Sequence, residues 1–374
     1  MLRRCCRIAI LAMVLALQGQ TPQAADPEPY TVTIVKTPDS ALNAALSGSS
    51  DLESLRTTAP VGPFALVERA RRDQDRFVTA LQSFGYFKGR VAITINGHPL
   101  NDPSLVGLLQ QAPPTPPAKV DVAVMPGPQF HIGQVNVIGV VPPHAQAMLN
   151  LHSGQPAVAS DVLAAQGRLL NALREEGYAL AKVDLQPAVV HLNENVMDVA
   201  IKVATGPRVD IGPITFQGLD GVDASFIRRR LPLHEGELFS PSKIESARAD
   251  LAGLPIFSYV HAQPASALNA QGQLPMTIYF GERPLHAVDF GASYSTDLGV
   301  GLTAAWHDRN VFGNAEQLNL TAAFQGGGNS QLHPGYKVNA QFIKPDYYAL
   351  GQTLEVNVGA VDQDLLAYSQ KALL

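Results

Sequence analysis

A strict alternation of apolar and polar side chains after Pro284 is the feature that most constrains how this chain can fold. Five segments of roughly ten residues each place apolar side chains on one face and polar or small ones on the other. They begin near Val288, Leu302, Leu318, Tyr336 and Leu354. Since successive side chains of a strand point to opposite faces, each segment is predicted to be a β-strand.

The composition of the polar faces favours a membrane barrel over a sheet exposed to water. The polar positions carry Gln, Asn, Thr and Gly, which suit a wet interior. The connections also alternate, with compact aromatic turns at 309–314 and 344–351 and more open polar links at 326–335 and after Val361. Short periplasmic turns and longer outer loops are typical of transmembrane β-barrels. We therefore expect residues 285–374 to form the first strands of an antiparallel transmembrane barrel, with a water-facing sheet as the alternative.

The first 25 residues are predicted to be a secretory signal peptide. Three arginines precede an apolar stretch at 8–17, and Ala24 and Ala25 offer a cleavage site. An uncleaved anchor is disfavoured, because a membrane-spanning helix needs about 20 apolar residues. No apolar run of about 18 residues follows, so no transmembrane helix is expected.

Removal of this segment changes what chemistry the chain can carry. Both cysteines, Cys5 and Cys6, lie inside it, which excludes disulfides and cysteine-based sites from the mature chain. Losing three arginines and no acidic residue takes the formal charge from −5 to −8. That balance argues against a nucleic-acid partner.

An internal repeat organises the middle of the chain. Residues 121–139 and 198–218 both read as an alternating strand, a Gly-Pro turn, and a second strand with Ile-Gly near its start and a glycine at its end. Since repeated supersecondary units stack or follow one another as domains, the chain is predicted to contain tandem modules.

A helix precedes each strand pair and ends at a glycine. The first, at 64–86, carries a helical apolar pattern that ends at Gly85-Tyr86, with Phe64, Val67, Ala70, Phe77, Leu81 and Phe84 as its apolar residues. The second, at 158–178, has Ser160 or Asp161 as cap and ends at Gly177-Tyr178, with Val162, Leu163, Leu169, Leu170 and Leu173 on one side. The third opens at Ser240-Pro241 and closes at Gly253-Leu254.

Short helices are expected at 142–151 and 223–231, which gives each module the order β-α-α-β-β. The first module also contains an insertion at 97–118, whose Pro-rich end is predicted to be an exposed loop.

The order and size of these modules resemble the polypeptide-transport-associated (POTRA) domain. The resemblance implies an α+β fold of tandem POTRA repeats at 26–125, 129–204 and 208–283, followed by an incomplete outer-membrane β-barrel at 285–374. Generic α+β periplasmic modules are the alternative. The turn Arg309-Asn310-Val311-Phe312-Gly313 resembles the turn after the second barrel strand in the POTRA-plus-barrel superfamily of outer-membrane assembly and transport proteins. We expect Arg309, Asn310, Phe312 and Gly313 to be structural residues of a hairpin turn.

Three repeats resemble the TamA type within that superfamily, whereas BamA-type proteins are expected to carry five and two-partner secretion transporters two. This resemblance implies a location in the cell outer membrane, a role in autotransporter or barrel assembly, and a TamB-like periplasm-spanning partner. The superfamily barrel has sixteen strands, so the segment here reads as a fragment or a truncated barrel.

The resemblance also implies a seam at the first barrel strand, where a client pairs. On that strand the candidate residues are Val288, Asp289, Phe290, Gly291 and Ser293. Gly291 and its small neighbours should weaken pairing with a closing strand. An unfolded client would gain main-chain hydrogen bonds there.

Catalytic signatures are missing from the sequence. There is no HExxH, GxSxG or phosphate-binding loop, and His307-Asp308 would point to opposite faces of a strand. Asp362 and Asp364 are predicted to lie in a solvated outer loop. We therefore expect a protein without enzymatic activity, without cofactor and without metal; a secreted hydrolase and a soluble periplasmic scaffold are the alternatives from other classes.

Overall fold

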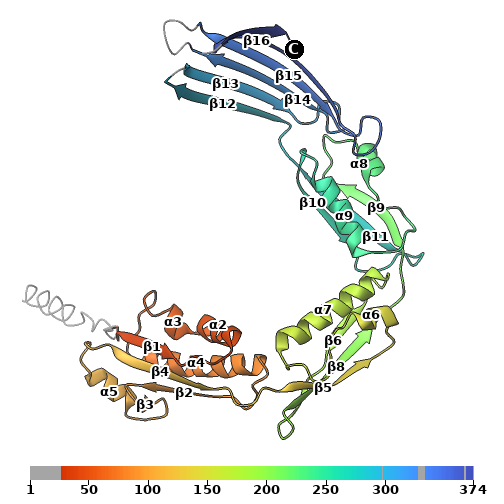
Figure 1. Ribbon diagram of the computed structural model, residues 1–374. Helices are drawn as coiled ribbons and strands as arrows, with labels where there is room; N and C mark the ends of the chain where they lie inside the picture. The colour runs from red at the N-terminus through yellow and green to blue at the C-terminus, as the bar shows by residue number, and fades with distance from the viewer. Residues whose placement is uncertain (1–26, 297, 327–332, 366–367, 374) are drawn as a thin grey trace, which may run out of the picture. The chain divides into compact units, whose positions relative to one another are not determined.

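The computed structural model describes residues 27–296, 298–326, 333–365 and 368–373 (Figure 1). The predicted signal peptide and most of the link at 326–335 lie outside these ranges. By contacts between Cα atoms the chain divides into two compact units, 1–139 with 149–168 and 184–202, and 140–148 with 169–183 and 203–374.

The first repeat is a four-stranded sheet covered by helices. Its strands are β1 (Tyr30–Ile34), β2 (Arg90–Ile95), β3 (His98–Pro99) and β4 (Ala118–Met125), in the order β1-β4-β2-β3. Its helices are α2 (Ser40–Ser49), α3 (Asp51–Ser54), α4 (Pro63–Ser83) and α5 (Leu105–Gln111). Strand β4 pairs in parallel with β1 and antiparallel with β2.

The apolar face of α4 closes the core of this repeat. Val67, Ala70, Phe77 and Leu81 are buried as predicted. Phe64, which also fits the helical spacing, is 65% exposed, because it lies in the first turn of the helix and off the apolar stripe.

Two charged residues of α4 are also buried, and both are fully hydrogen-bonded. Asp73 accepts hydrogen bonds from the Ser50 hydroxyl at 2.8 Å and from the backbone N–H of Leu52 at 2.9 Å. Arg69 donates to the Tyr30 hydroxyl at 2.9 Å and to a carbonyl of the following loop, that of Ala59, also at 2.9 Å. Buried charges are tolerated only when they are paired in this way, so these two residues fix α3 and the loop after it.

The insertion at 97–118 is partly folded, which the sequence did not predict. It contains the short strand β3 and the helix α5, whose Leu105 and Leu109 join the core. Its Pro-rich end, 112–117, has no regular structure and is largely exposed, as predicted.

The second repeat contains β5 (His131–Ile138), α6 (Pro143–Ala147), α7 (Ala159–Glu175), β6 (Lys182–Leu185), β7 (Val189–His191) and β8 (Val196–Ala204). Its sheet has the order β5-β8-β6, with β7 also paired to β8. Val162, Leu169 and Leu173 of α7 are buried as predicted, but Leu163 is 58% exposed because it lies one position off the apolar stripe.

The third repeat contains β9 (Ile211–Gln217), α8 (Ala224–Arg230), α9 (Pro241–Ala252), β10 (Phe257–Pro264) and β11 (Leu274–Glu282), in the sheet order β10-β11-β9. Ser240 caps α9 as predicted by accepting a hydrogen bond from the backbone of Lys243. In all three repeats the first strand pairs in parallel with the last, β1 with β4, β5 with β8 and β9 with β11.

The repeated Ile-Gly pair marks an irregularity in this parallel pairing. The register shifts between Ile132 and Val135 in the second repeat and between Leu274 and Met276, next to Gly212, in the third. A Cβ on Gly133 would lie 2.3 Å from a carboxylate oxygen of Asp198. Glycine is therefore needed where the bulge brings a neighbouring strand close.

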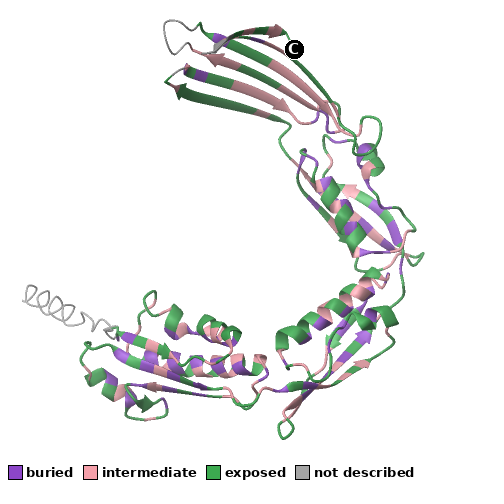
Figure 2. Cartoon of the chain, in the orientation of Figure 1, coloured by how far each residue is buried: buried purple, intermediate pink, exposed green. Residues whose placement is uncertain are grey.

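The residues after Pro284 form a six-stranded antiparallel sheet in the simple order β12-β13-β14-β15-β16-β17. The strands are β12 (His286–Ser295), β13 (Gly299–Asp308), β14 (Gln317–Gln325), β15 (Gly335–Lys344), β16 (Leu354–Leu365) and β17 (Tyr368–Leu373). Few of their residues are buried, in contrast to the strands of the repeats (Figure 2).

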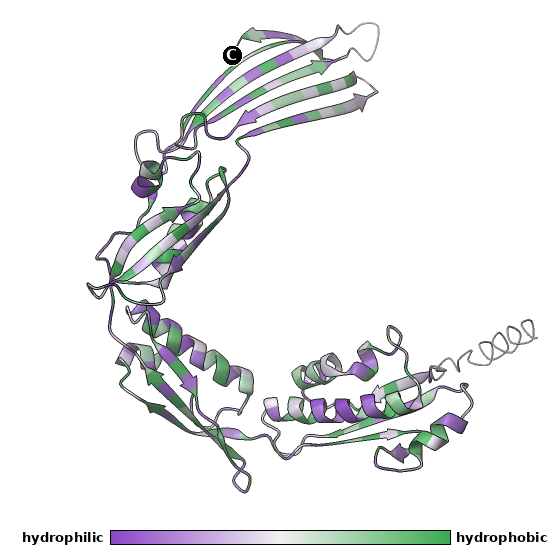
Figure 3. Cartoon of the chain, turned by 180° about the vertical axis from the view of Figure 1, so that it is seen from behind, coloured by the Kyte–Doolittle hydropathy of each residue, from purple (hydrophilic) through white to green (hydrophobic). Residues whose placement is uncertain are grey.

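The predicted outer loop after Val361 is instead strand. Residues 362–365 continue β16 and pair with β17, and Asp362 lies opposite Lys371. The alternation that identified the earlier strands is weak here because polar side chains occupy both faces. Hydropathy therefore gave no signal for this pairing (Figure 3).

Candidate functional site

Strand β12, the predicted seam, is an edge of the six-stranded sheet within the described residues. It pairs with β13 over ten successive positions, from His286 opposite Asp308 to Ser295 opposite Gly299. Its other edge pairs with no strand in the described part of the chain. Backbone N–H and C=O groups on that edge are therefore available for pairing with another strand.

The five predicted seam residues divide between the two faces of β12. Val288 and Phe290 are 56% and 82% exposed on the apolar face. Asp289, Gly291 and Ser293 alternate with them and lie on the polar face, opposite Ala305, Thr303 and Gly301 respectively. The structure thus brings all five onto one strand, but only three onto the polar face.

Small residues on the polar face allow a close approach of β12 and β13. A Cβ on Gly291 would lie 2.5 Å from the Thr303 hydroxyl, and one on Gly301 would lie 2.5 Å from the Ser293 hydroxyl. In each of these two cross-strand pairs on the polar face, a glycine therefore lies opposite a residue with a hydroxyl group. This arrangement removes side-chain packing from the polar face of the first hairpin.

A ladder of polar side chains crosses the polar face from β12 to β16. Asp289 lies 3.1 Å from Nε2 of His307, whose Nδ1 lies 2.7 Å from Oδ1 of Asn319. Asn319 donates to Gln341 at 2.9 Å, and Gln341 donates to Glu355 at 2.6 Å. Each side chain therefore supplies a hydrogen-bond or ion-pair partner for the next one, and such cross-strand contacts stabilise polar groups on the face of a sheet.

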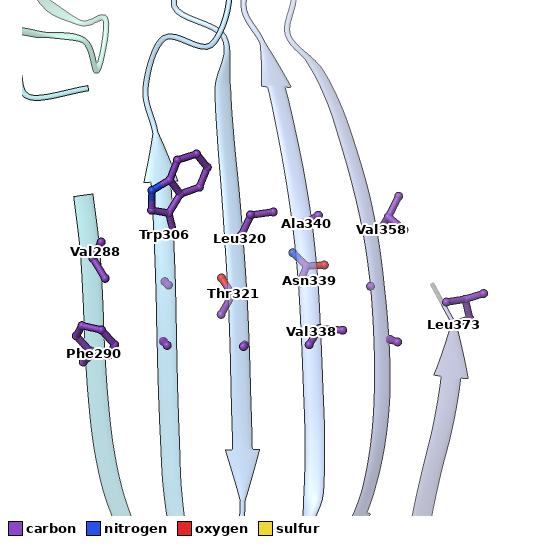
Figure 4. Close-up of a pocket in the computed structure, with 15 residues that line it drawn as sticks. Val288, Phe290, Trp306, Leu320, Thr321, Val338, Asn339, Ala340, Val358 and Leu373 are labelled. Carbon is purple, nitrogen blue, oxygen red and sulfur yellow. The ribbon is translucent and has the colours of Figure 1, made fainter. Parts of the chain in front are cut away.

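The opposite face is a continuous apolar surface. Val288, Trp306, Leu320, Ala340 and Val358 form one row across five strands. Figure 4 shows these side chains with Phe290, Val338 and Leu373 of the next row. An exposed apolar band on one face and polar residues on the other are what a lipid-facing barrel wall requires.

The predicted structural turn between β13 and β14 docks onto the third repeat. The Asn310 side chain is 8% exposed; its Nδ2 donates to the Gly221 carbonyl at 2.7 Å, and its Oδ1 accepts from Ala315 N–H at 2.9 Å. The Gly313 carbonyl accepts from the Asp223 N–H at 2.9 Å. Ala315 is fully buried in the core of the third repeat. The turn therefore contributes to that core.

Other members of this turn have distinct places. Arg309 donates to the Pro284 carbonyl at 2.7 Å, and Gly313 adopts a φ of +93°, which favours glycine. Phe312 is 68% exposed, and its ring centroid lies 6.3 Å from that of Phe342. Three of the four residues thus hold the junction, while Phe312 extends the apolar band.

Two acidic residues outside the turn complete the junction. The Glu282 carboxylate, at the end of β11, accepts backbone hydrogen bonds from Asp220, Gly221 and Val222 at 2.9 to 3.2 Å. Asp346, in the turn between β15 and β16, forms an ion pair with Arg230 of α8. No sequence signal identified either residue, because each depends on segments 60 or more positions away.

The predicted Gly-Tyr steps also form junctions. The Gly85 carbonyl accepts from Phe130 N–H, and the Phe130 carbonyl accepts from Ala157 N–H. In the next copy, Gly177 accepts from Val209, and Val209 accepts from Phe239.

A sequence signal for these junctions was present and was missed. The segments 151–155 and 233–237 read LHSGQ and LHEGE, and both make the same turn. Gly154 N–H donates to the Ile132 carbonyl, and Gly236 N–H donates to that of Ile211. The sequence repeat is therefore longer than the strand pair that first revealed it.

No helix in the described ranges is both long and apolar enough to cross a bilayer. Across that same part of the chain, no three His, Cys, Asp or Glu side chains gather closely enough to hold a metal ion.

No protein-family model matches the chain. It is similar to the outer membrane protein assembly factor BamA of Neisseria meningitidis serogroup B, with 20% identity over 208 residues, 54% of this chain and 26% of that protein. It is 22% identical to BamA of Nitratidesulfovibrio vulgaris over 218 residues, 56% of this chain and 27% of that protein. The chain spans well under half the length of these relatives.

A solved structure of BamA from Haemophilus ducreyi lacking POTRA domains 1–3 has the same fold. Its TM-score is 0.55 at 22% sequence identity, covering 64% of this chain and 44% of that one. The predicted fold class is confirmed: POTRA repeats are followed by strands of an outer-membrane β-barrel. The chain is therefore a protein of the cell outer membrane, with its repeats in the periplasm.

The similarity to these proteins supports a place in the POTRA-plus-barrel superfamily, and the curated relatives named here are BamA proteins.

Proposed function

We propose that this protein is an assembly factor for outer-membrane proteins, and that its first barrel strand pairs with a client strand. The observation that carries the proposal is the sparse packing of the first hairpin, where Gly291 and Gly301 each face a hydroxyl next to the outer edge of β12. A client strand that adds to this edge satisfies its own backbone groups, each of which would cost several kcal/mol if left unpaired in lipid. The name of the curated relatives, outer membrane protein assembly factor, supports the same function.

The proposed role needs no catalytic chemistry. Strand addition is driven by main-chain hydrogen bonds and by burial of apolar surface against lipid. We therefore propose a factor that works without ATP, cofactor or metal, with unfolded barrel proteins as clients and the lipid bilayer as surroundings. No nucleic acid takes part.

Single-cysteine cross-linking tests the seam. Because Cys5 and Cys6 lie in the predicted signal peptide, Asp289→Cys or Ser293→Cys introduces one thiol into the mature chain. We expect a disulfide adduct with a stalled client that carries a cysteine in its terminal strand. Thr321→Cys is the matched control, since it lies on the same face as position 289 but on β14, which has a neighbour on each side.

Adducts at 289 and 293 but not at 321 would support pairing at the edge. Absence of any adduct at 289 and 293, or equal adducts at 321, would refute the seam.

The narrower role is a choice between two types of assembly factor. The three repeats within 27–283 support a TamA-type role in autotransporter assembly with a TamB-like partner. The similarity to BamA supports general barrel assembly instead. Depleting the full-length protein in its own host separates them. Loss of autotransporters alone fits the TamA type, and loss of all barrel proteins fits the BamA type.

A further inference from the structure

A hollow of about 530 Å³ lies where the third repeat meets the turn between β15 and β16. Its lining includes Phe226, Arg229 and Arg230 of α8, together with Lys344, Asp346 and Tyr348 of the sheet. The repeats are periplasmic, so this hollow lies at the periplasmic end of the barrel strands. It takes no part in the seam described above.

The charge of the lining is predominantly positive. Three cationic side chains, Arg229, Arg230 and Lys344, face one acidic residue of the lining, Asp346. Arg230 pairs with Asp346, yet its Nε atom is buried and donates no hydrogen bond within the described residues. A buried donor without a partner is costly, so an acceptor that enters the hollow would be stabilised.

Lys344 and Arg229 are only loosely held by the protein itself. The Lys344 ammonium lies 3.4 Å from the carboxylate of Glu316, and the Arg229 guanidinium lies 3.4 Å from the Ser225 hydroxyl. Both distances are at the long end for a charge-assisted contact. The Arg229 guanidinium can therefore turn toward a bound anion, while the Lys344 ammonium, which compensates the buried Glu316 carboxylate, adds positive charge beside it.

The rim of the hollow is apolar and aromatic. Tyr348 and Leu350 of the lining are 89% and 62% exposed, and Tyr347, beside them in the same turn, is 59% exposed. Tyrosine is enriched where a barrel wall meets the headgroup layer, because its ring is apolar and its hydroxyl is polar. Phe312, which packs on Phe342 of β15, extends the lipid-facing band toward this end of the sheet.

From this combination we propose that the hollow binds the phosphate of an anionic glycerophospholipid in the periplasmic leaflet. Arg229, Arg230 and Lys344 would hold the phosphate, and the acyl chains would lie along the apolar band. A soluble phosphate would gain nothing from the exposed tyrosines and leucine at the rim. Anionic headgroups, in contrast, place negative charge beside apolar chains, which matches both parts of the surface.

Lipid binding can be measured on the full chain in zwitterionic detergent micelles. Phosphatidylglycerol and phosphatidylcholine with identical acyl chains are added separately, and bound lipids are counted by native mass spectrometry. We expect selective retention of phosphatidylglycerol. In the variant Arg229→Gln we expect its affinity to fall about tenfold.

Arg228→Gln is the matched control, because it removes the same charge from the same helix but stacks on Phe216 outside the hollow. Equal binding of the two lipids by the unmodified chain would overturn the proposal without reference to any variant. An equal loss of phosphatidylglycerol affinity in Arg228→Gln would show that the effect comes from net charge and would overturn the proposal. Displacement of phosphatidylglycerol by millimolar inorganic phosphate would identify a general anion site and overturn the lipid assignment.

Discussion

Truncation of Asn310 should detach the first barrel hairpin from the third repeat. In Asn310→Ala, the buried N–H of Ala315 loses its acceptor and the Gly221 carbonyl loses its donor. A buried group left without a partner costs about 1–3 kcal/mol, and the second, more exposed group costs about 1 kcal/mol. We therefore expect the free energy needed to open the junction to fall by about 2–4 kcal/mol.

Hydrogen–deuterium exchange of the full chain in detergent micelles measures this opening directly. The Asp223 amide donates to the Gly313 carbonyl and keeps that partner in the variant, so its exchange reports opening of the junction. A loss of about 2–4 kcal/mol corresponds to exchange that is roughly 30-fold to 700-fold faster.

Two further variants test the reasoning. Asn310→Asp keeps an acceptor for Ala315 N–H but places a second oxygen and a buried charge against the Gly221 carbonyl, so its effect should be at least as large. Asn314→Ala is the matched control, because the Asn314 backbone N–H, which donates to Glu316 at 2.9 Å, is retained. Unchanged exchange at Asp223 in Asn310→Ala, or an equal effect of Asn314→Ala, would refute the account of the junction.

Two predictions concern the repeats. Gly177→Ala should destabilise the junction after the second repeat by about 1–3 kcal/mol, because φ is +94° and the new Cβ would lie 2.5 Å from Leu238. Urea unfolding followed by circular dichroism measures this loss of stability. Gly167→Ala is the control, since a Cβ there would meet open space and should not destabilise the protein. Hydrogen bonds from the Gln134 N–H and from His191 lower the pKa of Asp198, so its contribution to stability is complete above the unfolded pKa of about 3.9 and is lost as pH falls through the lower folded pKa. Protection of the Gln134 amide, corrected for intrinsic exchange, should fall over that acidic range in the native protein and stay flat in Asp198→Asn; a flat profile in both would contradict the assignment.

The apolar patterns of the sequence located most strands and helices, but they misplaced some side chains. Phe64 and Leu163 fit the apolar patterns of their helices, yet both are exposed. A single helical pattern does not say where the apolar stripe ends. The strand after Val361 was missed because its side chains do not alternate.

The sequence by itself determined the modules. A period of two defined the barrel strands, a period near 3.6 defined the long helices, and repeated glycines marked turns, since these properties depend on neighbours a few positions apart. It also placed the five seam residues on one strand. Only the tertiary structure decided the junctions and the cationic hollow. The partners of Glu282, Asn310 and Arg230 lie about 60 to 116 positions away along the chain, and a contact over that separation leaves no local periodicity to detect.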